Sequence, residues 1–205
     1  MKYVIGITGS IACGKSFVTS TLRNLGYPTI DTDKISHDLT ADGSVANEAL
    51  ALKFPEAINN GRLNRKILGE IVFNDKIRRE ELNHILHPLI YQMTEELINK
   101  YDGIIFVDVP LMFEAHFDKL CDKIICVYTS YESQIERLMS RDSITYEEAI
   151  KKINSQMPLK DKMEKSDFLL KSEENFDDTV NNIKIILNKI KEEYYAKTAW
   201  NIRAC

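Results

Sequence analysis

A glycine-rich stretch near the start of the sequence constrains the fold more than any other feature. It reads Gly9-Ser10-Ile11-Ala12-Cys13-Gly14-Lys15-Ser16, follows the apolar run from Tyr3 to Ile7 and precedes a helical pattern. Glycines let the backbone take unusual dihedral angles and approach a polyphosphate closely, while a following lysine and hydroxyl reach its β/γ-phosphates and Mg²⁺. A glycine turn that matches by chance is the alternative interpretation. The strand–loop–helix context favours a phosphate-binding loop from Gly9 to Ser16. The residues expected to bind the nucleoside triphosphate are Gly9, Ile11, Ala12, Cys13, Gly14, Lys15, Ser16 and Phe17.

The composition favours a single soluble domain that acts on small molecules. The 205 residues are 44% hydrophobic, and 27 Lys and Arg against 31 Asp and Glu leave a net charge of −4. This balance gives no electrostatic reason to expect a nucleic-acid or membrane partner. The four cysteines lack CxxC spacing, and no apolar run reaches the ~18 residues of a membrane span. We therefore expect a cytoplasmic protein with reduced thiols, present as a monomer or weak homo-oligomer.

Short apolar runs alternate with longer helical patterns, which is typical of βαβ units in a parallel sheet. Several runs are too apolar to have one solvated face, so we expect an α/β fold with helices on both faces of the sheet. The predicted strands are Tyr3–Ile7, Pro28–Ile30, Ile104–Val109, Lys123–Tyr128 and Phe168–Leu170.

A long segment interrupts this alternation between the second and third predicted strands. We expect a helical insertion over about 34–101, in which an apolar stripe from Leu82 to Leu97 predicts a helix that Pro88 interrupts or kinks. A lid is expected over about 131–165, which leaves residues 1–33, 102–130 and 166–198 for the core. A second apolar stripe, from Val180 to Tyr194, predicts the last helix of that core.

Acidic side chains follow two of the predicted strands, at the sheet edge where ligands bind in open α/β folds. Asp31 and Asp33 follow the second strand, and Asp33 could accept the proton of an acceptor hydroxyl or merely cap the next helix. Asp108 ends the third strand, where phosphate-loop enzymes organise Mg²⁺, although many strands end in an aspartate.

Four further groups of residues are candidates for the site or its supports. Leu111, Phe113 and Glu114 follow Asp108 and offer an apolar lining with one acid, or else a hydrophobic loop packed on the insertion. Gln134, Arg137 and Arg141 share one helical face, which is either a solvated surface or a way to bring an arginine to a transferring phosphoryl group. Thr145 and Glu148 predict a capping box that begins a second lid helix. His87 precedes Pro88 and either packs in the protein or points into the cleft.

Taken together, these motifs resemble dephospho-coenzyme A kinase over most of the chain, from about Lys2 to Leu170. The resemblance extends to Leu63-Asn64-Arg65, His87-Pro88, Pro110 to Glu114, Gln134 to Asp142, and Gln156. It implies a three-layer P-loop NTPase fold with strand order 2-3-1-4-5, an acceptor-binding insertion and a lid. It also implies transfer of the γ-phosphate of ATP, with Mg²⁺, to the ribose 3′-hydroxyl of dephospho-coenzyme A, the last step of coenzyme A synthesis.

The resemblance also implies roles for individual residues. Lys15, Asp33 and Arg141 would be catalytic, and Ser16 and Asp108 would hold the metal. The acceptor would be bound by Asp33, Arg65, His87, Pro88, Leu111, Phe113 and Glu114.

Some positions depart from the family pattern. Phe17 stands where a second hydroxyl residue is common, Ala12-Cys13 replaces Gly-Ser, and the segment after Leu170 lacks the familiar Asn-Gly ending. Another small-metabolite or nucleoside kinase on the same scaffold, or a nucleotide-dependent switch, is the alternative function.

Overall fold

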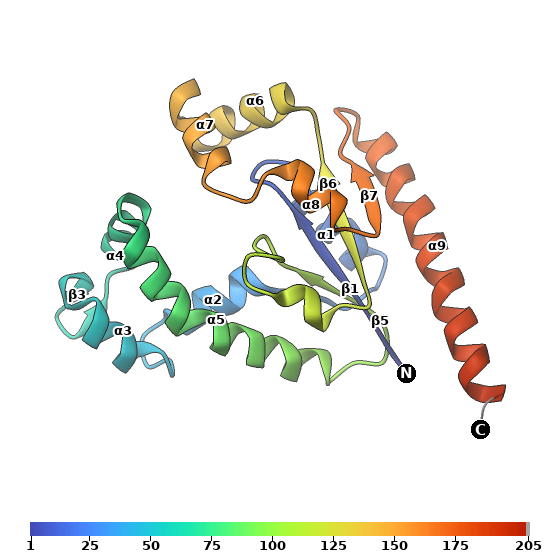
Figure 1. Cartoon of the computed structure of the whole chain (residues 1–205), viewed down its shortest axis with the longest axis horizontal. Helices are drawn as coiled ribbons and strands as arrows, with labels where there is room; N and C mark the ends of the chain where they lie inside the picture. The colour runs from blue at the N-terminus through green and yellow to red at the C-terminus, as the bar shows by residue number, and fades with distance from the viewer. Residues whose placement is uncertain (204–205) are drawn as a thin grey trace. The chain divides into compact units, whose positions relative to one another are not determined.

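The computed structural model describes residues 1–203 and has an α/β fold built on a five-stranded parallel sheet (Figure 1). The strand order is β2-β5-β1-β6-β7, which is 2-3-1-4-5 when the five strands are counted along the chain. The predicted fold class and strand order are therefore confirmed. The strands are β1 (Lys2–Gly9), β2 (Thr29–Asp31), β5 (Gly103–Asp108), β6 (Lys123–Tyr128) and β7 (Phe168–Lys171).

The register of the central strands brings their carboxyl ends to one edge of the sheet. On one side of β1, Ile7 pairs with Asp108 of β5, and on the other side Gly9 pairs with Val127 of β6. The last residue of β5 therefore lies level with the residues that lead into the glycine-rich loop. Groups that follow β1, β5, β6 and β7 can meet at this edge.

Helices cover both faces of the sheet in the core unit, which we define as Met1–Ile30 with the chain from Lys100 onward. On one face α1 and α9 contact each other and the strands, and on the other face α8 packs on β1 and β6 (Figure 1). The helices of this unit are α1 (Lys15–Asn24), the short η2 (Phe117–Leu120), α6 (Tyr131–Asp142), α7 (Tyr146–Asn154), α8 (Leu159–Glu164) and α9 (Phe176–Arg203).

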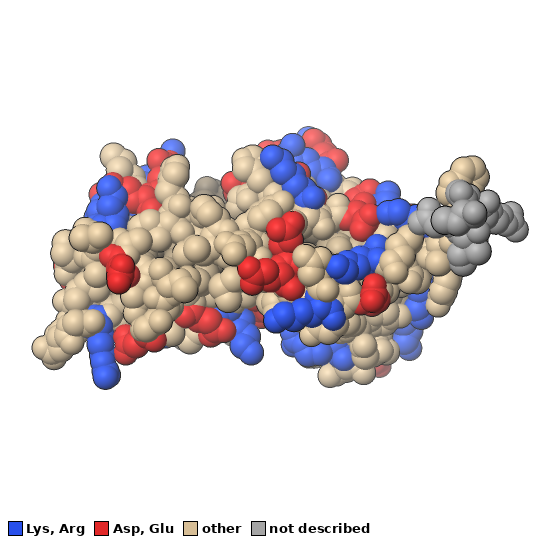
Figure 2. Space-filling model, turned by 90° about the horizontal axis from the view of Figure 1, so that it is seen from below, with Lys and Arg blue, Asp and Glu red and all other residues tan. Residues whose placement is uncertain are grey.

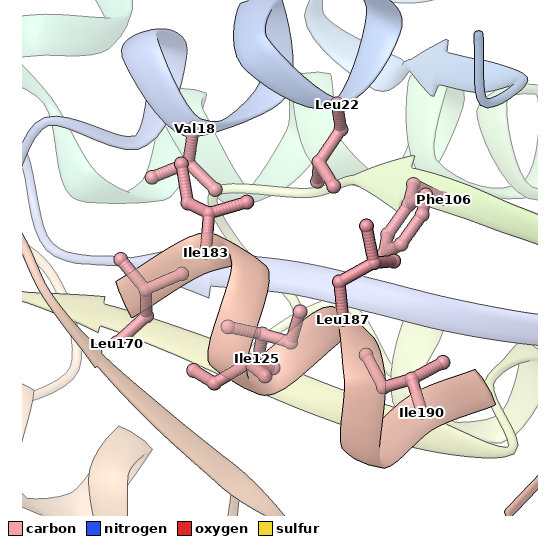
Figure 3. Close-up of a pocket in the computed structure, with 9 residues that line it drawn as sticks. Val18, Leu22, Phe106, Ile125, Leu170, Ile183, Leu187 and Ile190 are labelled. Carbon is pink, nitrogen blue, oxygen red and sulfur yellow. The ribbon is translucent and has the colours of Figure 1, made fainter. Parts of the chain in front are cut away.

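The apolar stripe predicted for the last helix forms the main core. Figure 3 shows Ile183 and Leu187 of α9 beside Val18 and Leu22 of α1, and Phe106, Ile125, Leu170 and Ile190 line the same gap. The gap among these side chains has no room for a water molecule. It is therefore part of the packed core and not a ligand site, because removal of this apolar surface from water is the main force that stabilises such a fold.

The insertion unit comprises Asp31–Asn99 and has its own helices. It also contains a small hairpin that the interpretation as a helical insertion did not include. Its turn is Asn60-Gly61, with φ of 50° and 76°, as a two-residue hairpin turn requires. The elements are α2 (Thr32–Leu39), α3 (Asn47–Lys53), η1 (Pro55–Ala57), β3 (Ile58–Asn59), β4 (Arg62–Leu63), α4 (Arg65–Asn74) and α5 (Lys76–Ile98).

Of the two predicted effects of Pro88, interruption of the helix is wrong, and a kink stays a prediction. Helix α5 continues through Pro88, although a proline there cannot donate the bond to the carbonyl of residue 84. His84 and Pro88 are both exposed, so they lie on a face of α5 where water can replace the missing bond. The buried positions of the predicted stripe, Leu86 and Ile90, lie away from that face.

Surface charge is mixed on the face of the molecule in Figure 2, where basic and acidic side chains are interspersed. Within residues 1–203, no helix is both long and apolar enough to cross a membrane.

Candidate active site

The glycine-rich loop between β1 and α1 has the backbone geometry of an anion-binding turn. Gly14 precedes α1 with φ 87°, a left-handed conformation that glycine takes without steric cost. A Cβ on Gly9 would lie 2.5 Å from the carbonyl oxygen of Val127, so only glycine fits beside β6. Ala12 also has a positive φ of 60°. The loop therefore requires a left-handed backbone conformation at this position, which glycine takes more easily than alanine. The N-terminus of α1 is thus open to an anion.

Two glutamines hold the backbone of Ile11 in this loop. The buried side chain of Gln134 in α6 donates to the carbonyl of Ile11 and to the hydroxyl of Ser10, each over 2.7 Å. Gln156, just after α7, accepts from the amide of Ile11 over 3.0 Å. Gln134 is therefore a support of the loop, and the interpretation of its helix face as a solvated surface does not hold for this residue. The Ile11 amide is therefore hydrogen-bonded within the protein, and nucleotide binding by Ile11 stays a prediction.

Lys15 and Ser16 begin α1, and their side chains lie in different surroundings. The Lys15 ammonium forms an ion pair with the carboxylate of Asp108, whose side chain is 9% exposed. The Ser16 side chain is exposed at the helix N-terminus. The structure therefore brings together two predicted site residues, Lys15 and Asp108, while Ser16 lies next to Lys15 in the chain. A carboxylate is a ligand that Mg²⁺ prefers, and a hydroxyl after the loop lysine is typical of Mg²⁺ sites in phosphate loops.

Cys13 is buried in the loop, and burial raises the pKa of its thiol to about 11. The group stays protonated near neutral pH and packs as a small apolar side chain. Cys121 and Cys126 are free as well, and Cys205 lies outside the described residues.

Arg137 connects the loop to the end of β7. Its guanidinium donates to the Ser172 hydroxyl over 3.1 Å and to the Glu173 carbonyl over 3.2 Å. A Cβ on Gly14 would collide with the same Ser172 hydroxyl, so these groups lie directly beside the phosphate loop. Arg137 is thus a binding partner of the loop after β7, and the solvated-surface interpretation is wrong for it too.

Lys162 is a buried cation that the sequence analysis did not single out. Its side chain is fully buried, and its ammonium lies 2.9 Å from Glu114 Oε1 and 2.7 Å from the Pro110 carbonyl oxygen. Glu114 Oε1 also accepts from the amide of Met157 over 3.2 Å. The part of the predicted lid that follows α7 is therefore fastened to the loop after β5. A lysine in a short polar helix is usually solvated, so no sequence pattern predicts this contact.

The ion pair with Lys162 involves the loop after β5 that contains Leu111, Phe113 and Glu114. The first two side chains are partly buried, and Glu114 uses its carboxylate to bind Lys162 and Met157. The role of these three residues in binding an acceptor stays a prediction. Glu114 would have to bind the acceptor while it also binds Lys162 and the Met157 amide.

The two lid helices form a compact pair. The predicted capping box is confirmed, since the Thr145 and Glu148 side chains each bind the backbone of the other residue. Arg141 is exposed and binds Asp142 over 2.8 Å, while Lys152 of α7 binds the same carboxylate over 2.7 Å. The hydrogen bonds from Arg141 and Lys152 lower the pKa of Asp142 to about 2. Arg141 is therefore exposed at the surface and paired with Asp142.

Asp31 ends β2 and Asp33 lies in the first turn of α2, and the two side chains have different surroundings. The Asp31 side chain accepts from the Lys34 amide over 3.1 Å and caps α2. The interpretation of Asp33 as that cap is therefore wrong. Asp33 is exposed in the first turn of α2, where the helix N-terminus favours a negative charge.

The other predicted site residues of the insertion unit lie in α4 and α5. Arg65 begins α4 after the Asn64 cap, donates to the Thr40 carbonyl over 3.3 Å and bonds His37. His87 is partly buried in α5 beside the exposed Pro88, and its pKa is lowered, mainly by burial and then by the charge of His84. His87 is thus a neutral imidazole near pH 7.

Comparisons with known proteins agree with this arrangement. The family model described as dephospho-CoA kinase matches residues 3–178. A dephospho-CoA kinase of Listeria monocytogenes is 38% identical over 185 residues, covering 87% of this chain and 92% of the relative. One from Fusobacterium nucleatum is 40% identical over 177 residues, covering 85% and 92% respectively.

A solved structure of a dephospho-CoA kinase from Campylobacter jejuni has the same fold. It superposes with a TM-score of 0.69 at 31% identity, covering 94% of this chain and 99% of the other. The loop geometry, the strand order and these matches lead to one assignment: this chain is a kinase that belongs to the dephospho-CoA kinase family.

Proposed function

We propose that this chain transfers the γ-phosphoryl group of ATP to the ribose 3′-hydroxyl of dephospho-CoA, the last step of coenzyme A synthesis. The observation that carries the proposal is the phosphate loop, with Lys15 held by Asp108 at the carboxyl edge of the sheet. A bond forms between the 3′-oxygen and the γ-phosphorus as the bond from that phosphorus to the β-phosphate oxygen breaks. ADP leaves, and the hydroxyl proton passes to a base.

Four predicted site residues of the core unit, Lys15, Ser16, Asp108 and Arg141, each have a task in this proposal. Lys15 and the loop amides bind the phosphates, and Lys15 exchanges Asp108 for a phosphate oxygen when ATP binds. Ser16 and Asp108 would hold Mg²⁺, which neutralises charge on the phosphates. Arg141 leaves Asp142 to stabilise the charge that develops on the transferring group.

The residues assigned to the acceptor are those that the family resemblance implies. Asp33 accepts the hydroxyl proton, and Arg65, with His87, Pro88, Leu111, Phe113 and Glu114, binds the rest of dephospho-CoA. Because His87 is neutral near pH 7, it can donate one hydrogen bond without adding charge. We place the reaction in the cytoplasm, where ATP is supplied.

The test is a transfer assay with ATP, Mg²⁺ and a panel of hydroxyl acceptors: dephospho-CoA, adenosine, pantetheine and shikimate. We expect ADP and a 3′-phosphorylated product only with dephospho-CoA, and mass spectrometry identifies the position of the phosphate. Lys15→Ala is the inactive variant, and Lys160→Ala, at a side chain that is 84% exposed, is the matched control. Efficient transfer to another acceptor in place of dephospho-CoA would contradict the proposal.

A further inference from the structure

The loop after β5 is fixed at its beginning by contacts with β1 and with α8. The Pro110 carbonyl oxygen accepts hydrogen bonds from the Thr8 hydroxyl of β1 over 3.3 Å and from the Lys162 ammonium of α8 over 2.7 Å. Two residues later, the fully buried Met112 side chain packs on β1, where a Cβ on Gly6 would lie 2.5 Å from Met112 Cε. The start of the loop therefore depends on β1 and on a single lysine.

The end of the loop is fixed by the same ammonium. Glu114 Oε1 lies 2.9 Å from Lys162 Nζ and also accepts from the Met157 amide over 3.2 Å. Glu114 Oε2 is buried without a hydrogen-bond partner among the residues that the structure describes. One fully buried ammonium therefore joins the first and last residues of the loop, because an ammonium carries three donors.

Two side chains between these fixed points are among those that the proposed function assigns to the acceptor. Leu111 and Phe113 are partly buried, so part of each remains accessible to a ligand. Their positions follow from the loop backbone, and that backbone is fixed at the residues on either side of them. Displacement of Pro110 or Glu114 would therefore displace the surface that meets the acceptor.

We propose that Lys162 is a positioning residue for the acceptor, because it holds the loop after β5 in the conformation in which Leu111 and Phe113 contact dephospho-CoA. The inference rests on the proposed use of that loop in acceptor binding and deepens it. Lys162 is fully buried, so it acts through the loop and does not touch the substrate. An apolar side chain of similar size would fill the same space without the cost of burying a charge, so the loop requires the two bonds of the ammonium and not its bulk.

Steady-state kinetics of Lys162→Met, with the calorimetric affinity of ATP measured in the absence of acceptor, test this role. We expect the KM for dephospho-CoA to rise about 10- to 100-fold, since a displacement of ~1 Å in a positioning contact costs up to about 10²-fold. The affinity for ATP should stay within about twofold of the wild-type value. Hydrogen exchange followed by mass spectrometry should be faster at residues 115–117, whose amides bond to the carbonyls of residues 111–113.

Two control variants separate positioning from a general loss of stability or of charge. Ile190→Ala removes a fully buried side chain from the core between α1 and α9, on the opposite face of the sheet from α8, and lowers stability to a similar extent. Lys160→Met removes an ammonium that is 84% exposed in the same helix as Lys162. Both variants should keep the wild-type KM for dephospho-CoA and the wild-type exchange of residues 115–117 relative to the rest of the chain.

A second variant keeps the test decisive if Lys162→Met does not fold. The double variant with Glu114→Gln leaves no charge of this pair buried, and Glu114→Gln alone is its reference. The KM for dephospho-CoA should still be higher in the double variant than in the reference, because the bond to the Pro110 carbonyl is also lost.

Three results would overturn the inference: an unchanged KM for dephospho-CoA in Lys162→Met, an equal loss of ATP affinity, or the same rise in KM in Ile190→Ala. The lysine would then be idle or merely structural. If the wild type phosphorylates another acceptor and not dephospho-CoA, the proposed function is wrong, and the KM for that other acceptor then decides the positioning role by the same criteria.

Discussion

The buried ion pair between Lys162 and Glu114 supports a quantitative prediction of stability. The Lys162→Met change removes the ammonium from a fully buried site and leaves the carboxylate with one remaining donor, the Met157 amide. Among the described residues, Glu114 Oε2 is already buried without a hydrogen-bond partner. Loss of one partner of a buried pair costs ~3–5 kcal/mol. Because the Glu114 side chain is 23% exposed, water can reach part of it, and we expect the lower end of that range.

A loss of about 3 kcal/mol lowers the midpoint of thermal unfolding by about 6–12 °C in a chain of this size. Circular dichroism of Lys162→Met, Glu114→Gln and the double variant at pH 7 measures this shift. The double variant should be more stable than Lys162→Met alone, because no uncompensated charge then remains buried. Lys160→Met is the matched control, since that side chain is in the same helix, is 84% exposed and pairs only at the surface with Glu164.

Two results would refute this reasoning. One is a midpoint for Lys162→Met within 2 °C of that for Lys160→Met, which would mean that the buried ammonium contributes no more than an exposed one. The other is a double variant whose loss equals the sum of the single losses, since residues in one ion pair should be coupled.

Three further predictions concern the transfer reaction. Lys15→Ala should lower turnover by several orders of magnitude and also lower the unfolding midpoint, because it removes the cation paired with Asp108; near-normal turnover in a folded variant would rule out the loop assignment. Arg141→Ala should lower kcat more than it raises the acceptor KM, and an NMR titration should show the pKa of Asp142 rising from about 2 toward its ordinary value. In the wild type this pair stabilises the lid above pH ~4, and that stability is lost as the pH falls toward 2. Asp33→Asn should lower kcat by ~10²–10⁴-fold with little change in the unfolding midpoint, since Asp31 caps the helix; wild-type kcat would remove Asp33 from the mechanism.

The strands and the main core could be predicted from the sequence because their signals are local. Buried parallel strands are continuous apolar runs, and Lys123–Tyr128 agrees with β6 at both ends. The Asn60-Gly61 turn is also a local signal for a hairpin, and attention to it would have found β3 and β4. The error at Pro88 has a different origin, since exposure of one helix face decides whether a proline is tolerated, and exposure depends on packing.

The hydrogen bonds that hold the site residues in place could not be predicted, because their donors and acceptors lie far apart in the sequence. Gln156 binds Ile11 across 145 positions, and Lys162 binds the Pro110 carbonyl across 52. A sequence pattern shows that such residues are polar, but the buried groups that they satisfy are fixed only when the sheet has formed. The phosphate loop was different, since its function is contained in eight consecutive residues.

The contacts of Ile11 link the phosphate loop mechanically to the helix pair that carries Arg141. Gln134 and Gln156 lie at the two roots of the lid, and both bind the backbone of Ile11. The side chains of Ile11 and Ala12 also pack on the apolar cluster between α6 and α7. That cluster and the Asp142–Lys152 pair hold the two helices together. Packed contacts and hydrogen bonds therefore run from the backbone of the phosphate loop to the helix that carries Arg141, and they depend on tertiary packing that the loop motif alone does not specify.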